Sequence, residues 1–415
     1  MISRRAAITA LGASALSAAG CGATHGVPLW FSYGGKNREV LLSLVSAFNQ
    51  DDPAHAIHPV YQGDYFELLA KLRTALHAGS APAVTHVVAE VLPYFVAANV
   101  LEPLDQMPGL AGDLGFVREL SQAGAFQRGD EQRMYGIPFN RSTPIAYCNG
   151  NLLDQLGLAP PRTWEELVAF ARTASLPGDS ARFGFSCPID WWFWVALVFQ
   201  AGGELTDGEG RFTLGGEAAV EALALWQRLV LTEKTMRTPT GRDYNAWGIT
   251  NREFLAGRAA MIWNSTAFVR YLEENAKFPV VAAPLPSGVR AGVPTGGTLF
   301  VMPKGSPPAW QEAGARFLAF MSRPAVSNEF ATKTGYIAVT RQGIADLEAA
   351  GYYERFKNDR VAVDQLKSAR AWPWHTELFR VQREAVQGRL EAAVLSGEDP
   401  RAVVKAALTA IERSR

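Results

Sequence analysis

The sequence predicts an α/β protein of two lobes, each a mainly parallel sheet flanked by helices. Its 415 residues are too many for one hydrophobic core and indicate two domains. Its N-terminal part alternates apolar strands with amphipathic helices, which implies a parallel sheet covered by helices on both faces. An extended segment at 136–149 is polar in its middle and apolar at both ends, as expected of a chain that crosses from one packed body into another.

The first lobe is predicted to open with three strands, at residues 29–33, 57–61 and 84–89, each followed by a helix. The first helix places five apolar residues on one face at helical spacing, namely Val40, Leu41, Leu44, Val45 and Phe48. In parallel sheets, ligands meet the loops that follow the carboxyl ends of the strands. Those loops contain residues 33–36, residues 62–65 and Glu90, so a binding site is expected there.

The crossing lies between Pro138 and Pro144. Proline fixes φ and has no backbone N–H, so neither residue suits a central strand. Between the prolines stand Asn140, Arg141, Ser142 and Thr143, and an apolar run at 145–147 follows. A ligand cleft between two lobes would lie at such a crossing. An ordinary edge strand accounts for the stretch equally well.

The second lobe is predicted to begin with a helix in which Thr163 and Glu166 form a capping box. A strand at 183–186, helices at 217–231 and 251–255, and a strand at 259–263 follow. The chain then returns through a proline-bounded crossing near 278–286, a strand at 293–302, a helix from Pro307, a loop at 333–340 and a terminal helix from Asp399. We assign residues 27–141 and 279–327 to the first lobe and residues 142–278 and 328–415 to the second, with a third crossing near 328–335.

The N-terminus is predicted to be an export signal. A basic Ser3-Arg4-Arg5 precedes the small apolar residues 6–19 and then Gly20-Cys21, which is the order found in secretory signals. The arginine pair resembles a twin-arginine signal, and general secretion remains the alternative. The end of residues 1–21 resembles a lipobox, so Cys21 is expected either to be lipidated or to be removed by simple cleavage. Cys148 and Cys187 are expected to be free and buried, with a disulfide between them as the alternative.

Composition and motifs exclude several classes of function. The 40 basic and 40 acidic residues balance, which argues against a nucleic-acid or membrane-surface partner. The sequence has no G-x-S-x-G, H-E-x-x-H, P-loop or Cys-x-x-Cys motif, and its six histidines are scattered. We therefore expect no catalytic residues, no metal and no cofactor.

Three tryptophans are clustered next to an acid, as Asp190-Trp191-Trp192-Phe193-Trp194. Tryptophan rings stack on the apolar faces of sugars and polyols, and they attract cations. Because three clustered tryptophans rarely fit one core, we expect Trp191 and Trp194 to line the cleft. Trp192 and Phe193 are expected to fill the core of the second lobe.

Several motifs together resemble those of the family 1 extracellular solute-binding proteins of ABC importers, in the branch that binds glycerol-3-phosphate. The segment NRSTPIAYCN is similar to the crossing of that family, VYQGDY to a segment that ends in a binding tyrosine, and KTGYIAVT to a binding loop. SAPAVTHVVAEV, the W-x-x-W pair, MIWNST, GGTLFVM and RVQREAVQGRLEA also match in order. The resemblance extends over nearly the whole chain after residue 21, and it implies the two-lobed periplasmic binding protein fold of type II.

The resemblance also implies a set of ligand-binding residues. Glycerol hydroxyls would be held by a phenol and a carboxylate, and phosphate by hydroxyls, a backbone amide and an arginine, with two tryptophans as the wall. The residues are Tyr65, Glu90, Ser142, Trp191, Trp194, Ser265, Gly296, Gly297, Tyr336 and Arg383. Arg141, next to Ser142, is the rival of Arg383 for the phosphate.

The function implied by the resemblance is that of a non-enzymatic, monomeric binding protein outside the cytoplasmic membrane. It would close on sn-glycerol-3-phosphate or on a glycerophosphodiester such as glycerophosphocholine, and the transmembrane subunits of an ABC permease would recognise the closed form. An oligosaccharide ligand is the alternative. A secreted carbohydrate-cleaving enzyme, with Glu90 and Asp190 as paired carboxylates, is the competing class.

Overall fold

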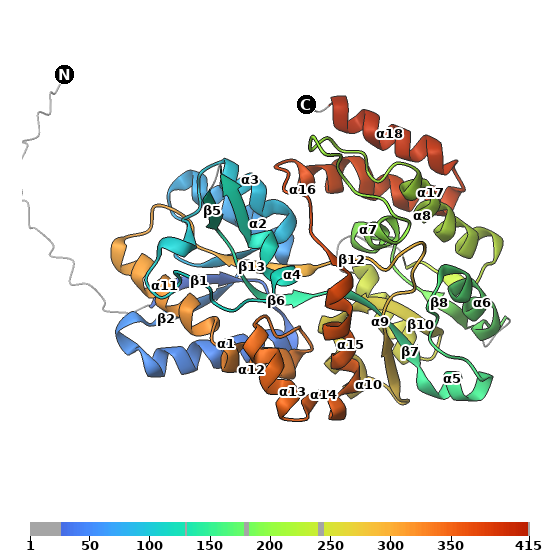
Figure 1. Ribbon diagram of the computed structural model, residues 1–415, viewed down its shortest axis with the longest axis horizontal. Helices are drawn as coiled ribbons and strands as arrows, with labels where there is room; N and C mark the ends of the chain where they lie inside the picture. The colour runs from blue at the N-terminus through green and yellow to red at the C-terminus, as the bar shows by residue number, and fades with distance from the viewer. Residues whose placement is uncertain (1–25, 129–130, 178–181, 240–244, 414–415) are drawn as a thin grey trace, which may run out of the picture.

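The computed structural model describes residues 26–128, 131–177, 182–239 and 245–413. Figure 1 shows two lobes side by side, with strand β6 (Ile137–Ser142) between them. The predicted export signal and Cys21 lie outside the described residues. Within the described ranges, no helix has the length and apolar character needed to cross a membrane.

The sheet of the first lobe confirms the predicted strand–helix alternation. β1 (Val27–Phe31) pairs in parallel with β2 (Ile57–Tyr61), and hydrogen bonds between β1 and Val84 attach β3 (Thr85–Val88) alongside it. β13 (Gly296–Val301) then pairs antiparallel with both β3 and β6. The helices packed with these strands are α1 (Gly35–Asp51), α2 (Tyr65–Ala78), α3 (Leu92–Ala97) and α11 (Pro308–Met321).

The sheet of the second lobe has the strand order β11-β7-β10-β8-β9. The strands are β11 (Val280–Ala283), β7 (Pro144–Asn149), β10 (Ala259–Ser265), β8 (Phe183–Ser186) and β9 (Met236–Arg237). β7 is antiparallel to both of its neighbours, whereas β10, β8 and β9 are parallel. Both sheets are therefore mixed, because β7 and β13 enter them from the other lobe rather than through a strand–helix–strand unit.

The second lobe contains α5 (Gly150–Leu156), α6 (Trp164–Ala174), α7 (Trp191–Gln200), α8 (Glu217–Gln227), α9 (Asn245–Leu255), α10 (Val269–Asn275) and α18 (Pro400–Arg413). Helices α6, α8 and α18 begin at the predicted residues, α9 begins earlier than predicted, and α5, α7 and α10 were not predicted. Thr163 caps α6 by accepting from the backbone N–H of Glu166. The Glu166 carboxylate accepts from the backbone N–H of Arg162 rather than from that of Thr163. The second hydrogen bond of the predicted capping box therefore lies one residue earlier than expected.

The chain after residue 327 packs differently from the predicted lobe boundary. The predicted crossing at 328–335 belongs mostly to helix α12 (Pro324–Thr334), which packs beside α1. Val326, Phe330, Ile337 and Ala362 join the same hydrophobic cluster as Leu29 in β1. The chain leaves that cluster after Leu366, and Trp372 and Leu378 join the cluster that contains Trp226 of α8. The apolar face of α12 thus keeps residues 328–339 with the first lobe, whereas α15 (Lys357–Gln365) lies at the junction, because it also packs on β11 of the second lobe.

Buried side chains connect the crossings to one another. Gln365, at the end of α15 (Lys357–Gln365), donates to Thr143 Oγ1 at 3.0 Å and to the carbonyl of Pro144 at 2.7 Å. Its side-chain oxygen accepts from the backbone of Leu285 at 3.0 Å. One amide therefore joins the crossing at 138–144 to the crossing near 278–286.

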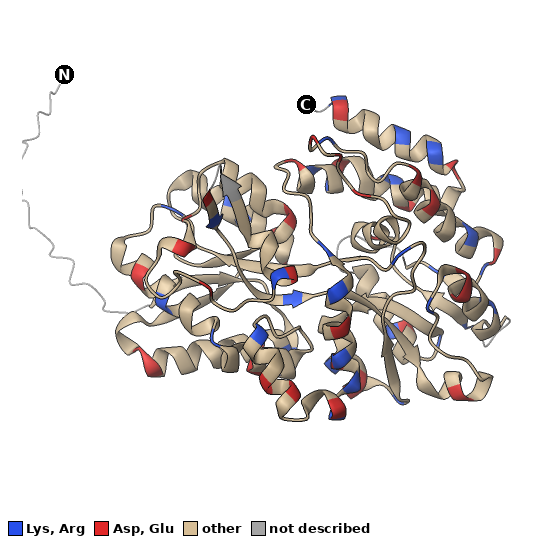
Figure 2. Cartoon of the chain, viewed as in Figure 1, with Lys and Arg blue, Asp and Glu red and all other residues tan. Residues whose placement is uncertain are grey.

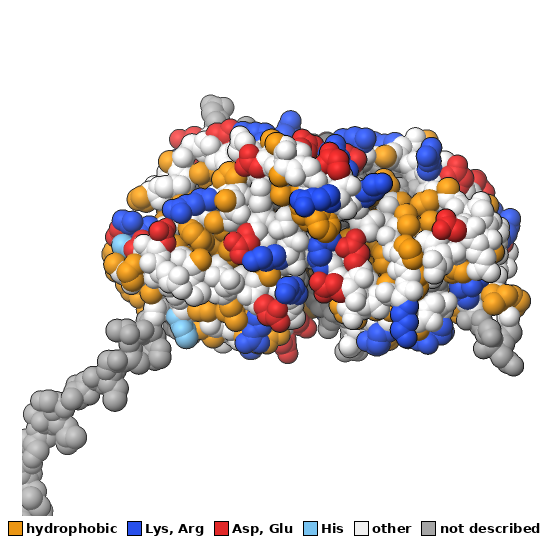
Figure 3. Space-filling view, turned by 90° about the horizontal axis from the view of Figure 1, so that it is seen from below, with side chains coloured by type: hydrophobic (Ala, Val, Ile, Leu, Met, Phe, Trp, Pro, Cys, Tyr) orange, Lys and Arg blue, Asp and Glu red, His pale blue; other side chains and the backbone are white. Residues whose placement is uncertain are grey.

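Cys148 and Cys187 are free and buried, as predicted. Burial raises the pKa of Cys148 to about 12, so its thiol is held in the protonated, unreactive form. Acidic and basic side chains are interspersed over both lobes (Figure 2). On the face in Figure 3, hydrophobic side chains are likewise mixed with charged and polar ones.

Candidate functional site

The crossing is buried along its whole length. All residues of β6 and β7 are buried, and Asn140 and Arg141 have no exposed surface. β6 is the edge strand of the first sheet, whereas β7 lies inside the second. The stretch is therefore both an edge strand, as β6, and a crossing from one lobe into the other. A buried polar segment between two lobes is costly unless its groups find partners, and the partners of these groups define the site.

A cluster of hydroxyl groups surrounds Asn140. Its Nδ2 donates to the phenol oxygen of Tyr65 at 2.9 Å and to that of Tyr336 at 3.4 Å. Tyr65 is the first residue of α2, and Tyr336 follows Gly335, which ends α12 in a left-handed conformation. Burial raises the pKa of Tyr336, so its phenol is neutral. Two of the predicted site residues are thus brought together by a third residue, which was not predicted.

The Arg141 guanidinium is buried between the lobes. Its Nη2 donates to Thr295 Oγ1 at 2.7 Å, while Nε and Nη1 have no hydrogen-bond partner in the part of the chain that the structure describes. Burial lowers the pKa of Arg141 to about 10, and Glu90 opposes that shift. The side chain is therefore a cation at neutral pH with two donor nitrogens still available.

Glu90 stands in the short 3₁₀ turn Ala89–Val91 after β3, where the parallel-sheet argument places a ligand contact. Burial raises the pKa of Glu90 to about 7; Arg141 lowers it and Asp190 raises it. These three charged side chains come from both lobes and act on one another. At neutral pH Glu90 can accept hydrogen bonds as a carboxylate or donate one as the acid.

Gly296, Ser142 and Trp192 meet closely. Gly296 is paired with Ser142 across β13 and β6. A Cβ atom at position 296 would stand 2.6 Å from the Trp192 ring and 3.0 Å from Ser142 Oγ, so only glycine allows the lobes this approach. Gly297 has φ of +84°, a conformation that other residues rarely adopt.

All three tryptophans are buried, and Trp192, which was predicted to lie in the core, is in contact with the first lobe. Trp191 and Trp194 are 0% and 1% exposed, whereas Trp192 is 8% exposed and reaches Gly296 of the other lobe. Trp192 also stacks on Trp247, with ring centroids 5.6 Å apart. Trp191 and Trp194 instead pack against each other, and Trp191 packs on Trp372. Ten-residue helix α7 is buried at every position, so sequence periodicity could not show which ring faces the other lobe.

The remaining predicted residues lie around this centre. Ser265 ends β10 opposite Pro144, and its Oγ accepts from the backbone of Ala267. Arg383 is exposed in a π-helical turn, with its guanidinium carbon 4.2 Å from the centroid of the Phe66 ring. Arg383 also lowers the pKa of Asp190.

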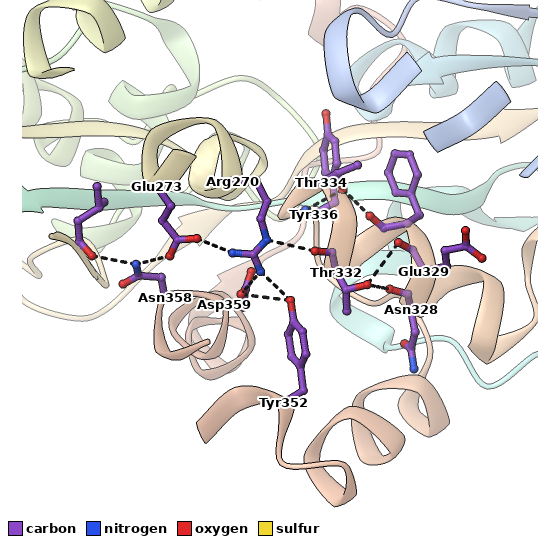
Figure 4. A network of polar contacts seen from close by, with 12 residues as sticks. Arg270, Glu273, Asn328, Glu329, Thr332, Thr334, Tyr336, Tyr352, Asn358 and Asp359 are labelled. Atoms are coloured by element: carbon purple, nitrogen blue, oxygen red, sulfur yellow. Dashed lines mark hydrogen bonds and ion pairs between the residues drawn. The ribbon is translucent and has the colours of Figure 1, made fainter. Parts of the chain in front are cut away.

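Next to the hydroxyl cluster, a polar network joins both lobes (Figure 4). Arg270 of α10 donates to the carbonyl of Thr332 at 3.1 Å and to Tyr352 Oη at 2.6 Å, and it is paired with Glu273 and Asp359. Thr332 lies two residues before the end of α12. Arg270 therefore holds the C-terminal end of this helix, and Tyr336 follows shortly after that end. A surface hollow of about 380 Å³ beside Arg270 is lined by none of the predicted site residues.

The sequence missed Asn140, Thr295, Thr298 and Trp372 as parts of this centre. Asn140 stood in the crossing, where a polar residue between two prolines was the available signal. Thr295, Thr298 and Trp372 have no local signal, because their partners are remote in sequence. Among the described residues, no group of three or more histidine, cysteine or acidic side chains could hold a metal ion.

The fold and this centre define a two-lobed protein with a buried polar centre between its lobes. The family model of bacterial extracellular solute-binding proteins matches residues 43–353, and the chain belongs to that family. It is 27% identical over 361 residues to the sn-glycerol-3-phosphate-binding periplasmic protein UgpB of Salmonella typhimurium, which covers 82% of this chain and 80% of the relative.

Solved structures share the fold. UgpB from Mycobacterium tuberculosis in complex with glycerophosphocholine has a TM-score of 0.81 at 24% identity, covering 93% of this chain and 97% of that one. The GacH receptor of Streptomyces glaucescens, solved unliganded and with acarbose, has a TM-score of 0.82 at 21% identity, covering 94% and 97%. Maltose-bound MalE3 of T. maritima has 0.79 at 20%, covering 94% and 100%. The type II periplasmic binding protein fold is thereby confirmed.

Proposed function

We propose that this chain is the extracytoplasmic binding component of an ABC importer for sn-glycerol-3-phosphate or a glycerophosphodiester such as glycerophosphocholine. Arg141 is the observation on which the proposal depends. A buried cation with two unused donor nitrogens suits a phosphoryl group, which accepts parallel hydrogen bonds from a guanidinium. Arg141 thereby takes the main phosphate role, and exposed Arg383 a peripheral one.

The other residues fit the rest of such a ligand. Tyr336, Ser142, Ser265 and the amides at Gly296 and Gly297 would hold phosphate oxygens, and Tyr65 with Glu90 would hold glycerol hydroxyls. The Trp192–Trp247 stack beside Asp190 suits the cationic head of glycerophosphocholine, with Trp191 and Trp194 as support behind it. The similarity to UgpB proteins supports the same ligand class.

The remaining parts of the proposal follow from the family. The protein would act outside the cytoplasmic membrane as a monomer, either anchored by a lipid on Cys21 or released by cleavage, and would deliver its ligand to the permease without cofactor or chemical change. Acarbose and maltose in the similar structures make an oligosaccharide the ligand to exclude.

Calorimetry against a small panel tests the proposal. Glycerol-3-phosphate, glycerophosphocholine, glycerol and maltotriose would each be titrated into the purified protein, and the products examined for cleavage. We expect tight one-to-one binding of at least one phosphate compound and no turnover, with a smaller radius of gyration in solution scattering when the ligand is bound. Binding of maltotriose alone would reject a glycerol phosphate as the ligand. Cleavage of any compound would reject a binding protein without enzymatic activity.

A further inference from the structure

Asn140 has a fixed orientation in its hydrogen-bond network. Its Oδ1 accepts from the backbone N–H of Thr298 at 3.1 Å and from Thr298 Oγ1 at 2.5 Å. A backbone N–H can only donate, so the amide oxygen must face Thr298 and the amide nitrogen must face Tyr65 and Tyr336. The side chain is completely buried and has no room to exchange these roles with water.

The direction of every hydrogen in the network follows from this orientation. Since Thr298 Oγ1 gives its hydrogen to Asn140, Tyr33 Oη, 3.2 Å from Thr298 Oγ1, must donate to it. Asn140 in turn donates to both phenol oxygens of Tyr65 and Tyr336. The network runs in one direction, from Tyr33 in the core of the first lobe toward the site between the lobes.

The phenol oxygens of Tyr65 and Tyr336 therefore act as acceptors toward Asn140. Asn140 supplies the hydrogens of these two bonds, so the phenols' own hydroxyl hydrogens do not point at Asn140. The pair can therefore present a donor to whatever lies between the lobes.

We infer that Asn140 is a positioning residue that holds the Tyr65–Tyr336 pair as a hydrogen-bond donor, so that this part of the site selects a ligand acceptor oxygen, best an anionic one. The inference rests on the proposed function, because it takes Tyr65 and Tyr336 as ligand contacts. It adds a direction of hydrogen bonding that the residue types alone leave open, since a phenol can donate or accept.

Asn140→Asp tests the inference because aspartate has nearly the same shape. Ionised aspartate only accepts hydrogen bonds, so above neutral pH it would turn both phenol hydrogens inward and remove the donor. Protonated aspartate can donate again. We expect affinity for glycerophosphocholine to fall at least thirtyfold at pH 8 and to recover most of that loss at pH 5. The phosphodiester keeps one charge over this range, so the ligand does not titrate.

The readout is the ratio of variant to wild-type affinity at each pH. The titratable groups facing the cluster are Tyr33, Tyr65, Tyr336, His86, Glu90 and Arg141, and all of them are shared by both proteins. Asn251→Asp is the matched control: it is a buried amide of α9 whose Oδ1 accepts from Asn264, a bond that a carboxylate retains. It should leave the ratio near one at both pH values.

A double-mutant cycle separates positioning from a general effect on folding. If Asn140 acts through Tyr336, the effect of Asn140→Asp should nearly vanish once Tyr336 is already phenylalanine. In that background the substitution should lower ligand affinity by less than threefold. Additive losses, or wild-type affinity of Asn140→Asp at pH 8, would overturn the inference. If the wild type binds maltotriose and neither phosphate compound, the proposed function fails, and the same cycle on maltotriose decides the inference separately. Binding of no panel member would reject both.

Discussion

Replacement of Arg141 by methionine should make the unliganded protein more stable while it weakens ligand binding. Methionine keeps much of the packing of the arginine stem and removes the charge. Nε and Nη1 of Arg141 have no partner among the described residues, and Nη2 has one, Thr295. Each unsatisfied buried donor costs about 1–3 kcal/mol, more when charged, whereas the bond to Thr295 contributes about 1.5–3 kcal/mol.

The balance of these effects favours the variant. We expect the free energy of unfolding of Arg141→Met to rise by about 1–3 kcal/mol relative to wild type, measured by urea denaturation without ligand at pH 7. Affinity for the phosphate ligand should fall by about 2–5 kcal/mol, roughly thirtyfold to several thousandfold. Arg141→Lys keeps the charge without the planar pair of donors and should recover only part of the affinity.

Arg383→Ala is the matched comparison, because Arg383 is exposed and lies over the Phe66 ring. It should change affinity less than Arg141→Met does. The reasoning would be refuted if Arg141→Met bound the ligand as wild type does and was also less stable. A larger loss of affinity in Arg383→Ala than in Arg141→Met would show that Arg383 is the main phosphate ligand.

Three further predictions concern other buried groups. Burial holds the pKa of Glu90 near 7 against an ordinary 4.5, so the folded state binds this proton more tightly than the unfolded state does. The free energy of unfolding should therefore fall by up to about 3 kcal/mol as pH rises from about 4.5 to 7. Urea denaturation of Glu90→Gln should not show this dependence on pH. Arg270→Ala leaves Asp359 unpaired at 10% exposure and should cost about 3–5 kcal/mol in the same melts, with Arg270→Leu/Asp359→Leu restoring most of it; an equal loss in both would contradict the pairing. Cys148 and Cys187 should not react with a thiol reagent in native Cys21→Ser protein but should both react in urea, and native labelling would disprove their burial.

The sequence predicted the elements better than their assignment to lobes. Helical spacing placed Val40, Leu44 and Phe48 on the buried face of α1, and all three are buried. The same reasoning could not place α12, because its apolar face fits either lobe and only its contacts with α1 decide. Local patterns specify an element, whereas the body on which it packs depends on residues far away in the sequence.

In the candidate site, too, local motifs predicted some residues, whereas others depend on contacts that are remote in sequence. Tyr65, Glu90, Ser142 and Gly296 were predicted from motifs, and the structure brings them to the junction of the lobes. Trp192 was expected in the core, yet it meets Gly296, since every position of α7 is apolar and no periodicity separates its faces. Asn140 owes its place to Thr298 and Tyr336, which are more than 150 residues away.

The buried crossing links the arrangement of the lobes to ligand binding. Asn140 and Thr143 have hydrogen-bond partners in other segments, and the backbone carbonyl of Arg141 accepts from Ile337 at 2.9 Å. The Arg141 side chain is the exception, because two of its nitrogens lack a partner in the described chain. A ligand anion at these nitrogens would pair the buried charge of Arg141 and so lower the electrostatic cost of bringing the lobes together. Ligand binding and lobe closure would then be stabilised by the same hydrogen bonds, so a neutral residue at position 141 should uncouple the two and let the lobes close without ligand.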